Sequence, residues 1–288
     1  MSLLWLVSVI WAFSFGLIKV YMVGVNPYYL SFLRLGLSLL FFLPFLRSGS
    51  LNKSSFLKYL GLGSLQFGFM YIFYLQAFIY LPAWQIALFT ITTPIYVTLI
   101  NDLFVKKFHW KNMLAALLSF AGAYIIKLPA EEMQLFLTGF ILVQLSNISF
   151  AIGQIGYKYL SDKEKIKKDK EVFAVMYLGG VLITLIGAII FTGDVDYHLR
   201  PAQVGVVLYL GIVASGICFF LWNLGGRKTS AAGLAIMNNM KIPLAILASV
   251  IVFKESLEPI RFLVGSLLIS LGFLTMIRKS DKDSGKNT

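Results

Sequence analysis

The chain contains 288 residues, of which 58% are apolar and 13% are charged, and its mean hydropathy is +0.81. So small a charged fraction cannot cover a surface that faces water, which excludes a soluble globular protein. A net charge of +12 would also suit nucleic acid, but the cations are distributed by loop, so we attribute the excess to membrane topology and expect no nucleic-acid partner.

Ten apolar runs follow one another along the chain, each close to the roughly 20 residues that a helix needs to cross a hydrocarbon core about 30 Å thick. They cover residues 3–23, 26–46, 56–79, 83–104, 112–127, 135–158, 172–192, 202–223, 231–253 and 260–277. The first run has neither a basic residue before it nor a small-residue cleavage site after Val23, so we expect a retained helix. The sequence therefore predicts an all-α integral membrane protein with ten transmembrane helices in the lipid bilayer.

The positive residues predict the orientation of these helices. If the N-terminus is cytoplasmic, 18 of the 25 Lys and Arg residues fall in inner segments and five fall in outer ones. Lys and Arg accumulate in cytoplasmic loops, so we expect both termini in the cytoplasm. The same inner cations also suit anionic lipid headgroups.

Two cations, Arg34 and Lys241, fall inside apolar runs, whereas all 13 acidic residues fall at helix ends, in loops or in the tail. An unpaired charge inside a bilayer costs at least a few kcal/mol. A small anionic substrate, most simply a carboxylate, would supply the missing counter-ion. Alternatively, Lys241 is neutral and bonds carbonyls freed by Pro243, or Arg34 bonds backbone carbonyls.

The two halves of the chain repeat one another. Pro94 and Pro243 lie inside long apolar runs, and each is followed by a similar motif, LLSFAG at 117–122 and LLISLG at 267–272. Five helices per repeat is an odd number, so the second copy is inverted, as in secondary transporters whose substrate lies near the midplane. We expect repeats at 1–128 and 134–280 and a cytoplasmic tail at 281–288. The two prolines are candidate hinges, or serve packing alone.

Polar residues in two of the runs are candidate substrate contacts. Gln144, Asn147 and Gln154 fall on one stripe of the run 135–158, and Asn238 lies one turn before Lys241. Amide side chains offer a donor and an acceptor together, which suits a ligand amide, urea or carboxylate. Hydrogen bonds between helices are the alternative explanation.

Aromatic pairs at helical spacing supply apolar surface for the same site: Trp11 with Phe15, Tyr71 with Tyr74, and Phe219 with Trp222. Such pairs also arise from packing, and Trp222 stands near the inner end of its run, where an inner gate is as plausible as a binding wall. The single cysteine excludes a disulfide framework. Both histidines and all acids lie away from the bilayer centre, so we expect no catalytic residue, metal or cofactor.

Several motifs together resemble the EamA-type transporters of the drug/metabolite transporter superfamily, in the carboxylate, amino acid and amine branch. They are WAFSF at 11–15, FLPFLR at 42–47, QLSNISFAIG at 144–153, ASG at 214–216 with Trp222 and Asn223, and GLAIMNNMKIP at 233–243. Within that branch the likeness is strongest to bacterial transporters of biotin. The resemblance implies uptake of biotin across the bacterial inner membrane by alternating access, with export of amino acids, amines or other metabolites as the alternative.

The resemblance also implies roles for individual residues, because biotin combines a carboxylate, a urea-like ring and an apolar bicycle. Arg34 or Lys241 would hold the carboxylate. The ureido group would fall to Asn147, Asn238 or Asn239, and the rings to Trp11, Phe15 or Trp222. Tyr74 and Gln144 complete the candidate substrate contacts.

Overall fold

The computed structural model describes residues 1–46, 51–81, 86, 89–127, 137–166, 168–191, 193, 198–253 and 259–284. Within these ranges, the side chains of residues 15, 19, 127, 241, 245–253, 273 and 275–284 are not described. The described part is helical and contains no strand. Because residues 134–136 and 285–288 fall outside it, so do the start of the expected second repeat and the end of the expected tail.

The helices are given in chain order, with 3₁₀ and π stretches labelled η. They are α1 (Ser2–Tyr21), α2 (Pro27–Phe42), η1 (Leu43–Phe45), α3 (Lys53–Gly63), η2 (Ser64–Phe69), α4 (Met70–Tyr80), η3 (Thr90–Thr92), α6 (Thr93–Val105), α7 (Trp110–Lys127), α8 (Leu137–Lys163), α9 (Asp169–Phe191), α10 (Pro201–Leu208), η4 (Tyr209–Ile217), α11 (Cys218–Arg227), α12 (Ala231–Phe253) and α13 (Pro259–Ser284).

Five continuous helical stretches of the described part are long and apolar enough to cross a membrane: Pro27–Phe45, Lys53–Tyr80, Leu137–Lys163, Asp169–Phe191 and Pro201–Arg227. Shorter apolar helices cover Ser2–Ile18, Thr90–Val105, Trp110–Ile126 and Pro259–Gly272. The prediction of an all-α membrane protein is confirmed at this level.

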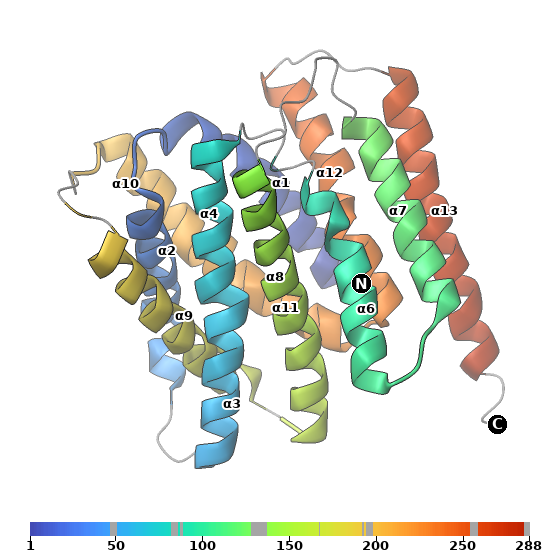
Figure 1. Cartoon of the computed structure of the whole chain (residues 1–288), viewed down its shortest axis with the longest axis horizontal. Helices are drawn as coiled ribbons and strands as arrows, with labels where there is room; N and C mark the ends of the chain where they lie inside the picture. The colour runs from blue at the N-terminus through green and yellow to red at the C-terminus, as the bar shows by residue number, and fades with distance from the viewer. Residues whose placement is uncertain are drawn as a thin grey trace.

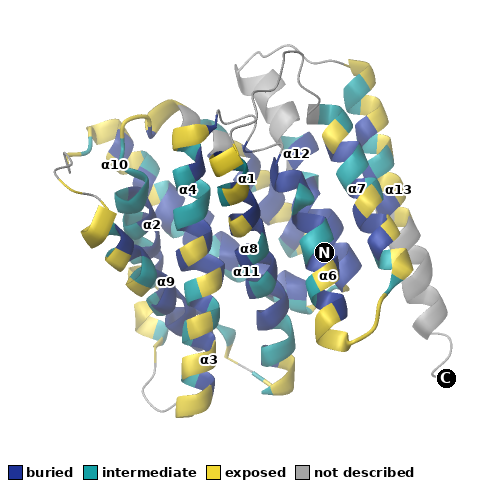
Figure 2. Ribbon diagram, viewed as in Figure 1, coloured by how far each residue is buried: buried dark blue, intermediate teal, exposed yellow. Residues whose placement is uncertain are grey.

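The helices form one bundle whose two edges are helix pairs (Figure 1). At one edge α7 packs against α13, and toward the other α2 packs against α9. Between them lie α8, which contacts α4, and α1, which contacts α12. Figure 2 shows buried residues where helices face one another and exposed residues on the outer faces and at the ends. The exposed side chains include many large apolar ones, such as Ile189, Leu103 and Ile260, as expected for a surface that faces lipid.

The packing between α7 and α13 occurs twice in equivalent form. A Cβ added to Gly122 would stand 2.5 Å from the carbonyl oxygen of Gly265, so the two backbones touch. Likewise, a Cβ on Gly272 would stand 3.0 Å from the carbonyl oxygen of Ala115. Residues 272 and 265 follow residues 122 and 115 by the same number of positions, so the two contacts map onto each other.

Two π-helical stretches interrupt long helices at matching places. The stretch η2 joins α3 to α4 and packs against α9, whereas η4 joins α10 to α11 and packs against α2. A π-helix inserts one extra residue into a turn and rotates the residues that follow it, and such stretches are frequent at functional sites.

The two prolines expected as hinges differ in their local setting. Pro243 is buried inside α12, as expected, but Pro94 lies in the first turn of α6, directly after η3. Proline is favourable in a first turn because its missing N–H would have no helical partner there. The carbonyl of Thr90, one turn earlier, accepts a hydrogen bond from Thr93 Oγ1 at 2.7 Å.

Ion pairs gather at one end of the bundle. Arg227 pairs with Asp162 and Asp169, and Lys58 pairs with Glu164 across 3.3 Å. We call these five residues the charged end. The N-terminus is nearby, since Thr229 donates a hydrogen bond to the sulfur of Met1.

Candidate functional site

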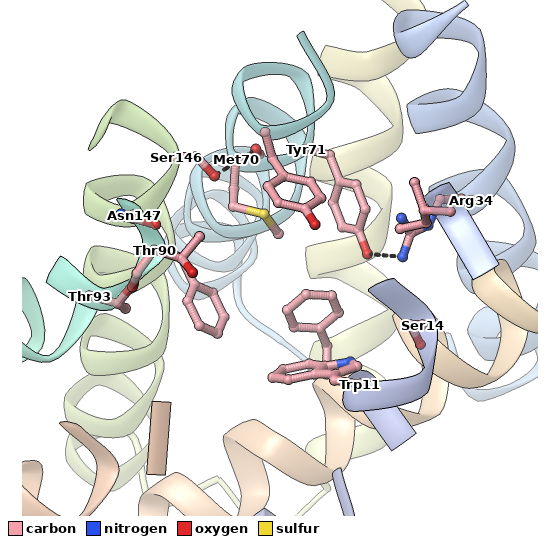
Figure 3. Close-up of a pocket in the computed structure, with 13 residues that line it drawn as sticks. Trp11, Ser14, Arg34, Met70, Tyr71, Thr90, Thr93, Ser146 and Asn147 are labelled. Atoms are coloured by element: carbon pink, nitrogen blue, oxygen red, sulfur yellow. Dashed lines mark hydrogen bonds between the residues drawn. The ribbon is translucent and has the colours of Figure 1, made fainter. Parts of the chain in front are cut away.

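A cavity opens between the helices of both halves of the chain (Figure 3), and the empty space in it and at its opening to solvent is about 690 Å³. We call it the central pocket. Its lining comes from α1, α2, α4, η3, α6, α8 and α11 and consists of Trp11, Ser14, Ile18, Arg34, Met70, Tyr71, Tyr74, Thr90, Thr93, Ser146, Asn147, Phe150 and Phe219.

Arg34 forms one wall of the central pocket and is only 4% exposed. Its Nε donates to Ser215 Oγ at 3.2 Å and its Nη2 donates to the Tyr71 hydroxyl at 2.8 Å, while Nη1 is buried without a partner. Among the described residues, no carboxylate pairs with this guanidinium. A buried arginine with an unused donor favours the binding of an anion, because its charge attracts a carboxylate and the free N–H can donate a hydrogen bond to it.

Ser215 reaches Arg34 because it lies within η4. Its hydroxyl donates to the carbonyl of Leu210, five residues earlier, at 2.6 Å, and it is also 2.7 Å from the Tyr71 hydroxyl. The π-helical turn leaves carbonyls without the usual helical partner, and the hydroxyl of Tyr177 donates to those of Ser215 and Gly216. The π stretch is thereby held in place and aims Ser215 at the guanidinium.

The opposite wall of the central pocket is neutral and polar, as Figure 3 shows for Asn147, Thr90 and Thr93 across from Arg34. The amide of Asn147 donates to the carbonyl of Phe89 and to Thr92 Oγ1, both at 3.0 Å. These bonds fix its orientation, because a carbonyl can only accept. Its side-chain oxygen therefore remains as an acceptor.

Aromatic rings line the space between the two walls. The indole of Trp11 lies 4.9 Å from the ring of Phe219 and 6.3 Å from that of Phe150, measured between ring centres. Its Nε1 donates to the carbonyl of Ala214 at 2.8 Å, which fixes the indole plane. The pocket thus has a positive end, a neutral hydrogen-bonding end and an apolar middle.

A second polar cluster lies next to the central pocket, toward the charged end. Gln66 Nε2 donates to Asn223 Oδ1 at 3.1 Å, and Trp222 Nε1 donates to Gln154 Oε1 at 2.9 Å. Asn238 Nδ2 donates to the same Gln154 oxygen at 3.4 Å. We call these five residues the amide layer. Trp222 also connects it to the pocket, since its ring centre is 5.0 Å from that of Trp11.

The side chains expected at the site are thus divided between several places. Trp11, Arg34, Tyr74 and Asn147 line the central pocket. Gln144 lies behind it, where Oε1 accepts from Thr92 and Tyr96. The remaining residues lie elsewhere: Trp222 and Asn238 in the amide layer, Asn239 bonded to the carbonyls of Ile91 and Ser119, and Phe15 and Lys241 with side chains outside the described part.

Several pocket residues were not among the expected contacts. The hydroxyl residues Thr90, Thr93 and Ser146 belong to this group. Ser215 was not expected either, and it holds Arg34 although it does not line the pocket. Tyr71 and Phe219 were expected as apolar surface, but the hydrogen bond from Arg34 to the Tyr71 hydroxyl was not. A weak signal existed for Ser215, because it precedes Phe219 by about one helical turn.

Comparisons with known proteins agree with this architecture. A sequence model of the EamA-like transporter family matches residues 1–128 and 137–278. The biotin transporter of Escherichia coli K12 is 37% identical over 93% of this chain and 90% of its own length, and the probable biotin transporter of Pseudomonas aeruginosa is 32% identical over 93% and 94%.

The fold is also found among solved structures. One crystal structure, 16% identical, covers 95% of this chain and 95% of its own and superposes with a TM-score of 0.75. Helices long and apolar enough to span a membrane agree with the multi-pass architecture of a transporter. The match of the family model to both halves, and these relatives along nearly the whole length, show that the chain belongs to the EamA-like transporter family.

Proposed function

We propose that the protein is a secondary transporter that takes up biotin across the bacterial inner membrane by alternating access. The observation that carries the proposal is Arg34, a buried cation that lines the central pocket, has an unused donor and has no carboxylate partner among the described residues. The biotin transporters named above support the choice of substrate, since biotin carries one carboxylate.

Biotin would lie across the central pocket with its carboxylate at Arg34. A carboxylate has two acceptor oxygens, and Nη1 of Arg34 is the donor left over for it. The aromatic rings of Trp11, Phe150 and Phe219 would contact the apolar bicycle. At the far wall, the Asn147 oxygen would accept from a ureido N–H. Tyr74 would close the side of the pocket, with Gln144 supporting the far wall.

The transporter would work with ten spans arranged as two inverted five-helix repeats at 1–128 and 134–280, followed by a tail at 281–288. The paired contacts between α7 and α13 and the matching π stretches η2 and η4 support this division, since each feature of one half has a counterpart in the other. Rocking of one repeat against the other would alternate access to a pocket that both repeats line. Pro94 and Pro243 are the candidate hinges.

Both termini would be cytoplasmic. The charged end collects Lys58 and Arg227 beside the N-terminus, and both residues are among the cations that the sequence assigns to the inner segments. The central pocket would then take biotin from the outer side, while the amide layer and the charged end lie on the cytoplasmic side.

Counterflow in proteoliposomes tests the proposal directly. The purified protein is reconstituted with unlabelled biotin inside, and labelled biotin is added outside. We expect transient accumulation of label, which biotin methyl ester inside fails to drive because the ester has no charge for Arg34. Liposomes that contain the Arg34→Met variant are the control. Accumulation driven equally well by amino acids or amines, and not by biotin, would favour the alternative of an exporter for those compounds.

A further inference from the structure

The amide layer separates the central pocket from the charged end. Along α8, Asn147 lines the pocket, Gln154 lies two turns or about 10 Å further on, and Lys158 bonds the carbonyls of Gly226 and Thr229 one turn beyond that. All five members of the layer are at most 2% exposed, although four of them are amides. Buried amides are normally fully hydrogen-bonded, so any unpaired atom here calls for an explanation.

Three atoms of the amide layer have no hydrogen-bond partner, and their identity is fixed by their neighbours. Trp222 Nε1 can only donate, so Gln154 turns its oxygen toward it and leaves Nε2 unused. Asn238 Nδ2 donates to the carbonyl of Leu234, which can only accept, so Oδ1 is unused.

The third unused atom follows from the same reasoning. Asn223 Nδ2 donates to the carbonyl of Phe219, so its Oδ1 must accept from Gln66 Nε2, and Gln66 Oε1 is left over. The layer therefore offers two acceptors and one donor that nothing in the described part of the chain uses.

This inventory is the complement of a cyclic urea, which has two N–H donors and one carbonyl acceptor. We propose that the amide layer is a second binding site for the ureido ring of the substrate, occupied on the way from the central pocket to the cytoplasm. The inference rests on the proposed function. Trp222 belongs to the layer and its ring also contacts that of Trp11 in the pocket, so a ring that leaves the pocket meets the layer next.

The two sites would divide recognition between them. In the central pocket Arg34 selects the carboxylate, whereas the layer contains no charged side chain among its five members and selects the urea. A substrate with the right acid but no urea would bind the pocket and leave the layer unpaired, which penalises it because buried polar groups without partners are costly.

Lipoate tests this division, because it has the same acidic tail as biotin and a ring without N–H or C=O groups. Exchange of labelled biotin is measured in proteoliposomes, with unlabelled biotin or lipoate as inhibitor. The half-inhibitory concentration of lipoate divided by that of biotin reports recognition of the urea, and a high ratio means that biotin is preferred. We expect Gln154→Met and Asn238→Leu to lower this ratio about tenfold each, the effect of losing a buried hydrogen bond.

Thr184→Val is the matched control, since it removes a buried hydroxyl that bonds only carbonyls of its own helix. We expect it to leave the ratio unchanged. If Gln154→Met or Asn238→Leu lowers the melting temperature, Gln66→Met replaces it, because within the described residues the side chain of Gln66 bonds only Asn223. An unchanged ratio in the folded variants overturns the second site. Failure of the wild-type protein to exchange biotin at all overturns the proposed function instead.

Discussion

The side chains of Arg34 and Tyr71 contact each other in two ways. Nη2 of Arg34 donates a 2.8 Å hydrogen bond to the Tyr71 hydroxyl, and the guanidinium carbon stands 4.5 Å from the centre of the Tyr71 ring. Tyr71 thus holds a cation by a hydrogen bond and by its ring without neutralising it. The position of the charge in the central pocket depends on this tyrosine.

Replacing Tyr71 by Phe keeps the ring and removes the hydroxyl that Arg34 and Ser215 share. We expect the Kd of biotin to rise about fivefold to tenfold, because one net hydrogen bond is lost and the guanidinium is less well oriented. Isothermal titration calorimetry on the purified protein measures this change. Tyr124→Phe, at an exposed position on α7, is the matched control and should bind like the wild type. Equal losses in the two variants would contradict the role of Tyr71.

Replacing Arg34 by Met removes the charge while keeping much of the apolar stem. We expect biotin to bind about a hundredfold more weakly, which corresponds to the loss of a charge-assisted interaction. Biotin methyl ester, which has no negative charge, should bind the variant as well as it binds the wild type. Thermal-shift titrations with both ligands separate the two cases. A parallel loss for acid and ester would show that Arg34 supports the pocket shape and does not contact the carboxylate.

Sequence reasoning proposed Arg34 and Asn147, which both line the central pocket, because each is a costly polar residue in an apolar run. It could not find Ser215 in the same way. Serine is common in membrane helices, and its direction depends on the π turn of η4, which shifts every later residue away from the regular helical period. The role of the Ser215 hydroxyl in orienting the guanidinium therefore becomes clear only from the structure.

Adjacent residues on α12 illustrate a second limit. Asn238 and Asn239 are about 100° apart around a helix, so they face different neighbours. Asn238 joins the amide layer, whereas Asn239 bonds carbonyls of Ile91 and Ser119. Helical periodicity predicts that Asn238 and Asn239 lie on different faces of α12, but only the packing of the helices determines which of them joins the amide layer. The all-helical fold with helices able to span a membrane, by contrast, followed directly from hydropathy, because length and apolarity determine it.

Cysteine labelling tests the proposed orientation. Cys218 is the only cysteine in the sequence and is fully buried, so Cys218→Ala gives a background without thiols. Val23, between α1 and α2, is 70% exposed, and Lys107, between α6 and α7, is also exposed. In intact spheroplasts a membrane-impermeant maleimide should label Val23→Cys and spare Lys107→Cys, which reacts only after lysis. The opposite pattern would place the charged end outside the cell.

The close contact between α7 and α13 predicts a large effect of a very small substitution. In Gly265→Ala the new Cβ would lie 2.3 Å from the carbonyl oxygen of Gly122, and because that oxygen is backbone, the helices must separate. We expect a loss of about 2–3 kcal/mol of stability, seen as a lower melting temperature in detergent.

Gly61→Ala is the matched control, because nothing lies within 4 Å of its added Cβ. Alanine in a helix is favoured over glycine by up to about 1 kcal/mol, so this variant should melt at the same temperature or slightly higher. If Gly265→Ala also melts like the wild type, α7 and α13 do not approach each other as closely as described.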